Sequence, residues 1–191
     1  LRPPQATVLL KRKLHMNLLK LLRSLVKMNS ISLIGMAGCG KSTIGNAISK
    51  EFNFSFIDTD HLIENKFKMS LEDVKKKFGY EYVRSVEEEV ILDLDSSTQI
   101  ISTGGSAVYS GLSMKHLKSF SKIIYINTPL ETIIGRIDDG QERGLAVPDG
   151  LSISDIYHER RPLYEKFSGH IVDGSKSVAE IIEEILKINN E

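Results

Sequence analysis

Short apolar runs alternate with longer amphipathic stretches along the chain from residue 30 onward. The apolar runs are typical of buried strands, and stretches with apolar positions every three or four residues are typical of helices. Strands that alternate with helices predict a three-layer α/β/α sandwich around a five-stranded parallel sheet. We expect strands in 30–35, 54–58, 99–105, 122–127 and 170–173, and helices in 41–52, 60–93, 129–137, 152–167 and 177–188.

Composition limits the class of protein. The chain has 191 residues, 41% of them apolar, and no internal repeat, so we expect one folded domain, residues 28–191. Cys39 is the single cysteine, which excludes an internal disulfide and fits a reducing, cytoplasmic location. No apolar run reaches the roughly 20 residues of a membrane span. We expect a monomer that binds a small molecule and no nucleic acid.

The charge is unevenly distributed. The whole chain has a formal net charge of zero, yet no acidic residue precedes Glu51, and residues 1–27 contain seven Lys or Arg. This leader, expected to be poorly ordered, is open to three interpretations. It is an upstream extension before Met28, a transit peptide directing the protein to an organelle, or an arm that binds a membrane surface or nucleic acid.

A glycine-rich stretch follows the first expected strand. Residues 35–42, GMAGCGKS, fit the G-x-x-x-x-G-K-[ST] pattern between a strand and a helix. Glycines allow successive backbone N–H groups to surround phosphate oxygens, and the N-terminus of the following helix attracts the same anion. The sequence therefore predicts a nucleoside triphosphate site with Mg²⁺, in which Lys41 approaches the phosphates and Ser42 binds the metal. The cofactor-binding residues expected in this loop are Gly38, Cys39, Gly40, Lys41, Ser42 and Thr43.

Two aspartates follow the second expected strand. Asp58 and Asp60 lie in FIDTD, and residues i and i+2 of an extended chain point to the same side. One carboxylate can then hold the metal while the other receives a proton from an acceptor hydroxyl. The alternative is that one of them caps a helix, which suits Asp60.

With these two aspartates added to the glycine loop, the chain resembles the shikimate kinase family over residues 29–188. The resemblance is carried, in order, by LIGMAGCGKSTIG, FIDTDHLIE, FGYEYVRSVEEEVI, STGGSAV, two spaced arginines and ERRPLYEKF. It implies P-loop kinase architecture with a lid, and transfer of a phosphoryl group from ATP to the 3-hydroxyl of shikimate, with Mg²⁺, in aromatic amino-acid synthesis.

The resemblance also implies roles for single residues. Asp58 would hold Mg²⁺ together with Ser42, and Asp60 would bind the acceptor and take its proton. Arg84 and Arg160 would bind the substrate carboxylate beside Gly104 and Gly105, which suits the planar fork of arginine. Arg136 would stack on adenine. Arg143 would approach the transferred phosphoryl group as a catalytic residue, together with Lys41 and Asp60.

Two positions depart from the family pattern. Ser106 occupies the place of a third glycine, and Gly144 follows the expected lid arginine, where a proline is usual. Residues 136–152 are the lid candidate, and an ordinary surface loop is the alternative. Both departures concern the acceptor or the lid and neither concerns the glycine loop, so a kinase of another small hydroxylated acid stays open. A catalytically silent binding protein is a further alternative, although Lys41, Asp58 and Asp60 are all present.

Overall fold

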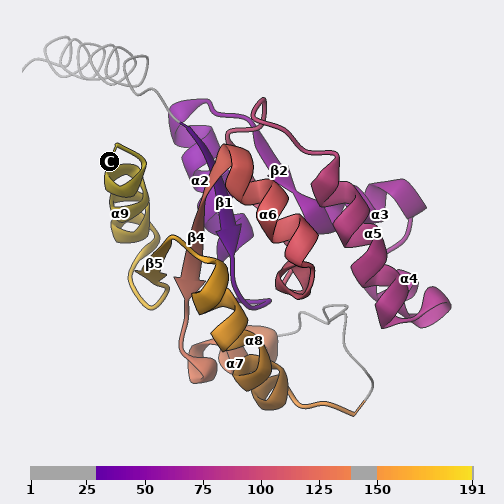
Figure 1. Cartoon of the computed structure of the whole chain (residues 1–191). Coiled ribbons are helices and arrows are strands. Elements are labelled where there is room, and N and C mark those ends of the chain that lie inside the picture. Colours follow the sequence, from indigo (N-terminus) through magenta and orange to yellow (C-terminus); the bar gives the residue numbers. More distant parts are fainter. Residues whose placement is uncertain (1–28, 139–149, 191) are drawn as a thin grey trace, which may run out of the picture.

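The computed structural model describes residues 29–138 and 150–190. Its centre is a parallel sheet of five strands, as the sequence predicted (Figure 1). The strand order, which the sequence analysis did not address, is β2-β3-β1-β4-β5. The central strand β1 is buried along its whole length, which explains its short apolar sequence. The strands are β1 (Ser30–Ile34), β2 (Phe56–Asp58), β3 (Ile100–Ser102), β4 (Ser121–Asn127) and β5 (His170–Asp173).

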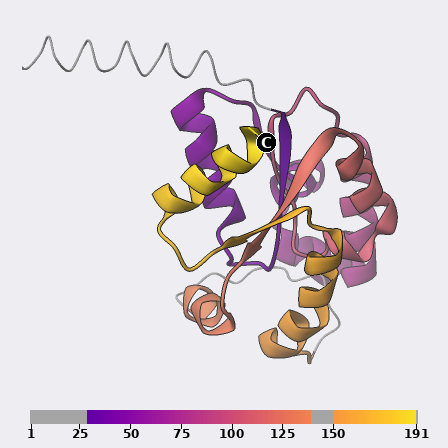
Figure 2. The ribbon, with the colours of Figure 1, turned by 60° about the vertical axis from the view of Figure 1, so that its left-hand side comes forward.

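Helices cover both faces of the sheet. Figure 2 shows α2 (Lys41–Phe52) and α9 (Val178–Asn190) on one side, and α6 (Gly111–Phe120) and α8 (Ile153–Phe167) on the other. The predicted three-layer sandwich is therefore confirmed. The chain crosses from one side of β1 to the other between β3 and β4, and ligands of such sheets bind outside the carboxyl ends of the strands at this point.

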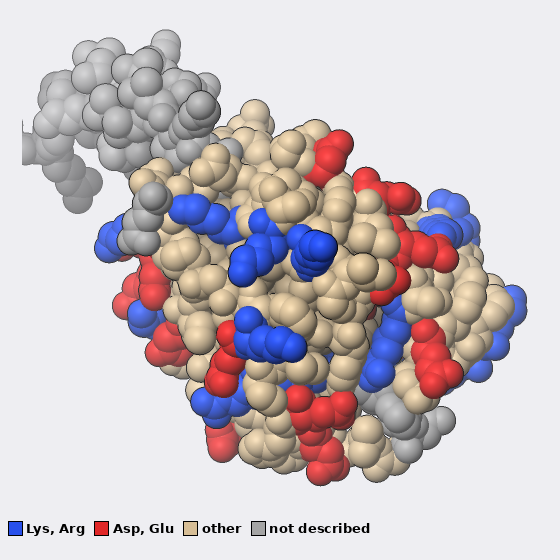
Figure 3. Space-filling model, viewed as in Figure 1, with Lys and Arg blue, Asp and Glu red and all other residues tan. Residues whose placement is uncertain are grey.

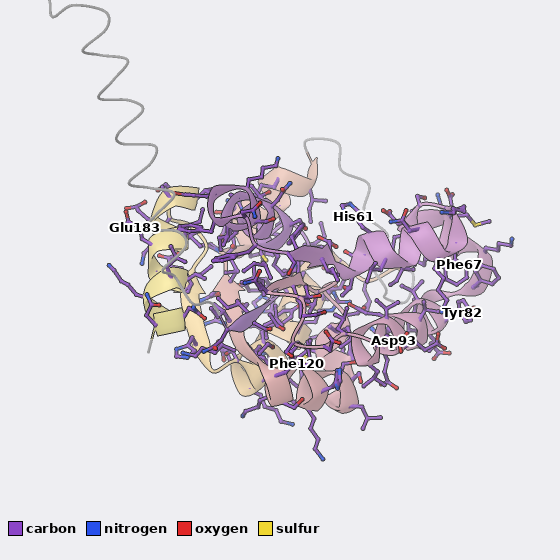
Figure 4. All side chains as sticks on the ribbon, turned by 90° about the horizontal axis from the view of Figure 1, so that it is seen from above. His61, Phe67, Tyr82, Asp93, Phe120 and Glu183 are labelled. Carbon is purple, nitrogen blue, oxygen red and sulfur yellow. The ribbon has the colours of Figure 1, made fainter. Side chains whose placement is uncertain are left out.

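Three helices form a projection beyond β2. They are α3 (Thr59–Phe67), α4 (Leu71–Phe78) and α5 (Tyr80–Leu92), with a small core of their own around Val74 and Val83. At its outer end, Phe67, Phe78 and Tyr82 contact one another, with ring centroids 5.0 to 5.9 Å apart (Figure 4). The inner end of α5 packs on α6 and carries residues of the candidate site.

The structure adds two elements that the sequence analysis did not predict. The single turn η1 (Ala107–Tyr109) and helix α6 occupy the interval between β3 and β4. The predicted stretch 60–93 is three helices, because Lys68 and Gly79 adopt positive φ angles of 56° and 89° that end α3 and α4. Helix α7 (Leu130–Asp138) begins directly after Pro129, and α8 continues through Pro162.

Acidic and basic side chains are interspersed on the face of the molecule that Figure 3 shows. None of the helices in the described part of the chain has the length and apolar content that a membrane crossing requires. The leader, residues 1–27, lies outside the described residues, as does Arg143 with most of the lid candidate.

Candidate active site

The glycine loop connects the carboxyl end of β1 to the first residue of α2. Gly38 and Gly40 have φ angles of 80° and 108°, which a side chain would strain. Gly40 is the N-cap of α2, and no side chain caps this helix end. Its N–H groups are therefore available to an anion that lies against the loop.

Lys41 lies inside this loop. Its side chain is buried, and its Nζ donates hydrogen bonds to the carbonyls of Gly35 at 2.8 Å and Met36 at 2.9 Å. Cys39 is also buried, with its Sγ 3.7 Å from the same Nζ. The loop thus holds one positive charge at the point where the sheet reverses its strand order.

A cavity of about 440 Å³ opens beside the loop. This volume lies in the range of small-molecule sites. Arg136, from α7, borders the cavity and donates a hydrogen bond from Nη1 to the carbonyl of Gly38 at 3.1 Å. All six predicted loop residues line it, and the full lining is Gly38, Cys39, Gly40, Lys41, Ser42, Thr43, Ile44, Arg136, Gly174, Lys176, Val178 and Ile181.

Oxygen ligands for a hard cation lie at the edge of this loop. Ser42 Oγ is 3.4 Å from Ser102 Oγ, and Ser102 pairs in register with Asp58 on the adjacent strand. Mg²⁺ typically binds one or two protein oxygens and keeps water or phosphate as its other ligands. The donors present therefore fit the ion, and the described residues contain no cluster of three or more His, Cys, Asp or Glu that would suit a different metal.

The two aspartates differ from the expected arrangement. Asp58 is the last residue of β2 and the N-cap of α3, and its Oδ1 accepts a hydrogen bond from the backbone N–H of Asp60 at 3.1 Å. Asp60 is therefore a first-turn helical residue. The expectation that an extended chain runs through both aspartates was therefore wrong. The alternative that one of them caps a helix is confirmed, but for Asp58 and not for Asp60.

Asp60 reaches Gly104 from one side. A methyl group added at Gly104 would overlap Asp60 Oδ1 and Glu87 Oε1, so both carboxylates lie directly against this glycine. Thr59, the residue between the two aspartates, holds Gly104 beside Asp60, because its Oγ1 accepts a hydrogen bond from the Gly104 N–H at 2.8 Å. The D-T-D segment and the glycine pair thus form one unit.

Glu87 is a member of the site that the sequence analysis did not identify. Its side chain is 2% exposed, and its Oε1 has no hydrogen-bond partner within the described structure. Burial and the nearby charge of Asp60 raise the pKa of Glu87 to about 7, although Ser106, Arg160 and Lys41 oppose the shift. The sequence contains one signal that could have indicated Glu87: it lies three residues after Arg84, on the same face of a predicted helix.

Ser106 binds this carboxylate. Its hydroxyl donates a hydrogen bond to Glu87 Oε2, and its side chain is buried. The serine that departs from the family's glycine therefore contacts the acidic pair beside Gly104.

The two arginines expected to bind a carboxylate come together at Tyr109. The Arg84 guanidinium lies 3.8 Å from the centroid of the Tyr109 ring, and that of Arg160 lies 5.2 Å from it. Arg84 comes from α5 and Arg160 from α8, so segments 76 positions apart meet on one side chain. Tyr109 was not predicted, because its η1 turn has no periodic sequence signal.

Arg160 is held firmly against the glycine pair. It is 1% exposed, and a methyl group at Gly105 would lie 3.0 Å from its Nη1. Burial lowers the pKa of Arg160, but Tyr164, Tyr109 and Glu87 together raise it above its ordinary value, so the guanidinium stays charged. Tyr164 also holds α8 against the glycine pair, because its hydroxyl donates a hydrogen bond to the Gly105 carbonyl at 2.6 Å.

The sheet order and the loop at its reversal point place the chain among the P-loop phosphotransferases, and the acidic and arginine side chains opposite the loop suit a small-molecule acceptor. Within that class it belongs to the shikimate kinase family, whose model matches residues 37–189.

Individual relatives agree. The chain is 38% identical over 161 residues to a shikimate kinase of Clostridium botulinum (strain Alaska E43 / Type E3), covering 84% of this chain and 96% of that one. The crystal structure of a shikimate kinase from Aquifex aeolicus aligns with a TM-score of 0.71 and 33% identity, over 83% of this chain and 94% of that one. A shikimate kinase from Acinetobacter baumannii in complex with shikimate has the same fold, with a TM-score of 0.75 and 24% identity over 87% of this chain and 95% of the other.

Proposed function

We propose that this protein phosphorylates the 3-hydroxyl of shikimate with ATP, releasing shikimate 3-phosphate and ADP. The observation that carries the proposal is the arrangement around Gly104 and Gly105. Asp60 and Glu87 lie against the first glycine, and the buried Arg160 lies against the second. A small molecule with hydroxyl groups and one carboxylate complements these charges.

The loop side would bind ATP. The N–H groups at the start of α2 and the charge of Lys41 suit the phosphates, and the cavity beside Arg136 suits the nucleoside. Arg143, outside the described residues, is proposed to approach the transferred group when the lid closes. Mg²⁺, held by Ser42 and by Asp58 through water, would neutralise phosphate charge.

The acceptor side would position and deprotonate the alcohol. Asp60 accepts the proton while the hydroxyl oxygen bonds to the γ-phosphorus, and the bond from that phosphorus to the β,γ-bridging oxygen breaks to release ADP. Arg84 and Arg160 bind the acceptor's carboxylate and thereby direct one hydroxyl toward the phosphate. Positioning and charge neutralisation are the main contributions of a protein to this reaction.

A coupled assay of ADP release tests the proposal. We expect turnover with shikimate well above the ATPase rate without acceptor, and a much higher kcat/KM for shikimate than for quinate or gluconate. A preference for either of those acids would assign the protein to another hydroxy acid. ATP binding without turnover of any of the three would indicate a silent binding protein.

Location and assembly belong to the same proposal. A cytoplasmic monomer is what the single buried cysteine supports, together with the fact that one chain supplies the described residues of the candidate site. Size-exclusion chromatography with light scattering of the full chain tests the assembly. Fractionation of cells that express the chain with residues 1–27 present or removed tests whether the leader directs the protein elsewhere.

A further inference from the structure

Tyr109 is fixed by the turn that follows the glycine pair. The backbone N–H of Tyr109 donates to the Ser106 carbonyl at 3.0 Å, and the N–H of Ser110 donates to the Ala107 carbonyl at 3.1 Å. Ser110 in turn caps α6 and donates its hydroxyl to Glu88 of α5. The half-buried Tyr109 ring is therefore held between α5 and α8 by bonds at both ends of its turn.

The ring contacts two positive charges. The Arg84 guanidinium lies 3.8 Å from the centroid, close enough for a cation–π contact, and Arg160 lies at 5.2 Å. The phenol adds a chain of hydrogen bonds, because Arg160 Nε donates to Tyr109 Oη at 3.3 Å and Tyr109 Oη donates to Glu159 Oε1 at 2.8 Å. Tyr109 thus contacts both arginines, and Tyr80, with its ring centroid 5.1 Å from the Arg84 guanidinium, contacts one of them.

Two guanidinium groups that share a ring repel each other, so holding them together needs a compensating group. The π electrons of Tyr109 and the nearby Glu87 carboxylate supply part of the compensation, and a carboxylate bound between the arginines would add to it. Arginine binds a carboxylate well only when the planar fork is oriented toward it. Long side chains from different helices lose considerable conformational entropy when they adopt such an orientation without support.

We propose that Tyr109 is a positioning residue whose ring and hydroxyl hold Arg84 and Arg160 in the arrangement that receives the acceptor's carboxylate. This inference rests on the proposed function, since it takes that acceptor to be a carboxylic acid. Tyr109 itself does not touch the reacting atoms. It lowers the cost of assembling the arginine pair before the acceptor arrives.

Steady-state kinetics of Tyr109→Leu and Tyr109→Phe with shikimate and with shikimate methyl ester test the proposal. Tyr109→Leu should raise the KM for shikimate about 3- to 30-fold, as expected from loss of the cation–π contacts. It should leave the KM for ATP unchanged and alter turnover of the ester little, because the ester presents no carboxylate charge. Tyr109→Phe, which keeps the ring, should raise the KM less.

Tyr82→Leu is the matched control, because Tyr82 is 40% exposed at the outer end of the projection, and its kinetics should equal those of the unaltered protein (Figure 4). An unchanged KM for shikimate in Tyr109→Leu, or equal losses for the acid and its ester, would overturn the proposal.

Failure of the proposed function gives a different result, namely no turnover of shikimate by the unaltered protein. A second measurement decides the role of Tyr109 in that case. In urea unfolding, the double variant Tyr109→Leu with Arg84→Gln should lose less stability than the two single variants together, because they remove the same contact. Additive losses would show that Tyr109 does not hold Arg84.

Discussion

The Ser106 hydroxyl donates a hydrogen bond to the Glu87 carboxylate, which joins the turn after β3 to helix α5 inside the proposed acceptor site. Glu87 Oε2 accepts this bond, whereas its Oε1 has no partner within the described structure. A buried carboxylate with so few donors is costly to ionise. The stability of this protein should therefore depend on both residues.

Ser106→Ala removes the donor to Glu87. Because the carboxylate then loses its hydrogen bond in a buried position, the free energy of unfolding at pH 8 should fall by about 1–3 kcal/mol. At pH 5.5 the loss should be smaller, since a protonated carboxyl is cheaper to leave without a donor. Urea denaturation at both pH values measures the difference.

Ser113→Ala is the control for that experiment. Ser113 is also a fully buried serine, but its hydroxyl has no hydrogen-bond partner within the described structure, so its removal should cost little. Equal destabilisation by the two substitutions would mean that the bond to Glu87 contributes nothing specific.

Glu87→Gln should alter how stability depends on pH. The folded-state pKa of Glu87 is about 7, raised from 4.5 by burial and by Asp60, and opposed by Ser106, Arg160 and Lys41. Between these values the folded protein keeps a proton that the unfolded chain releases. The contribution of Glu87 to stability is therefore present below pH 4.5 and is lost as pH rises to about 7, by at most about 1.4 kcal/mol per pH unit.

Unfolding free energies of the unaltered protein and of Glu87→Gln, measured from pH 4.5 to 8, test this sign. The difference between the two proteins should shift in favour of the glutamine variant as pH rises through the window. Glu89→Gln removes an exposed carboxylate from the same helix and should leave the pH dependence as it was. If the unfolding free energy of Glu87→Gln depended on pH in the same way as that of the unaltered protein, this would contradict the raised pKa of Glu87.

The fold was predictable because its signals are local. Alternating strand and helix patterns identified all five strands and most helices, and the glycine loop identified the edge of the sheet where the site lies. Helix α6 was missed, since GLSMKHLKSF opens with a glycine and contains two serines, which favour helix ends and turns over helix interiors. The breaks between α3, α4 and α5 depend on left-handed residues within a charged stretch, and no periodicity marks them.

The candidate site was predictable only where a motif covers it. Motifs named the glycine loop, Arg84 and Arg160, and the structure brings the two arginines together at Tyr109, while their roles stay predictions. The roles of Glu87, Ser106 and Tyr109 depend on contacts between β3–α6, α5 and α8, which sequence spacing does not show. The orientation of Asp60 was missed for a similar reason, because its backbone N–H donates a capping hydrogen bond to Asp58 Oδ1 and this bond places Asp60 in the first turn of α3.

Gly104→Ala should reduce turnover of the acceptor selectively. The added methyl group would overlap the carboxylate oxygens of Asp60 and Glu87 and displace both. A displacement of about 1 Å at a reacting group can cost about 100-fold in rate, so kcat/KM for shikimate should fall by about that factor. ATP binding, measured by calorimetry, should be unchanged.

Gly111→Ala is the matched control, because a methyl group there would meet nothing within 4 Å and α6 would gain a better helix former. Loss of ATP affinity in Gly104→Ala, or full activity in that variant, would contradict the placement of the acceptor beside this glycine.

Asp60→Asn tests the proposed proton acceptor. The amide keeps the size of the side chain and the backbone N–H that Asp58 caps, so α3 should form as before. It cannot take a proton from the alcohol, and kcat should fall by about 10²- to 10⁴-fold. Affinity for MgATP should change little, because the loop and its cation site are separate from this carboxylate.

Asp93→Asn, at the exposed C-terminal end of α5, is the control and should leave kcat unaltered. Equal losses of turnover and of ATP affinity in Asp60→Asn would show that Asp60 has a structural role, and an unchanged kcat would assign the proton to another group.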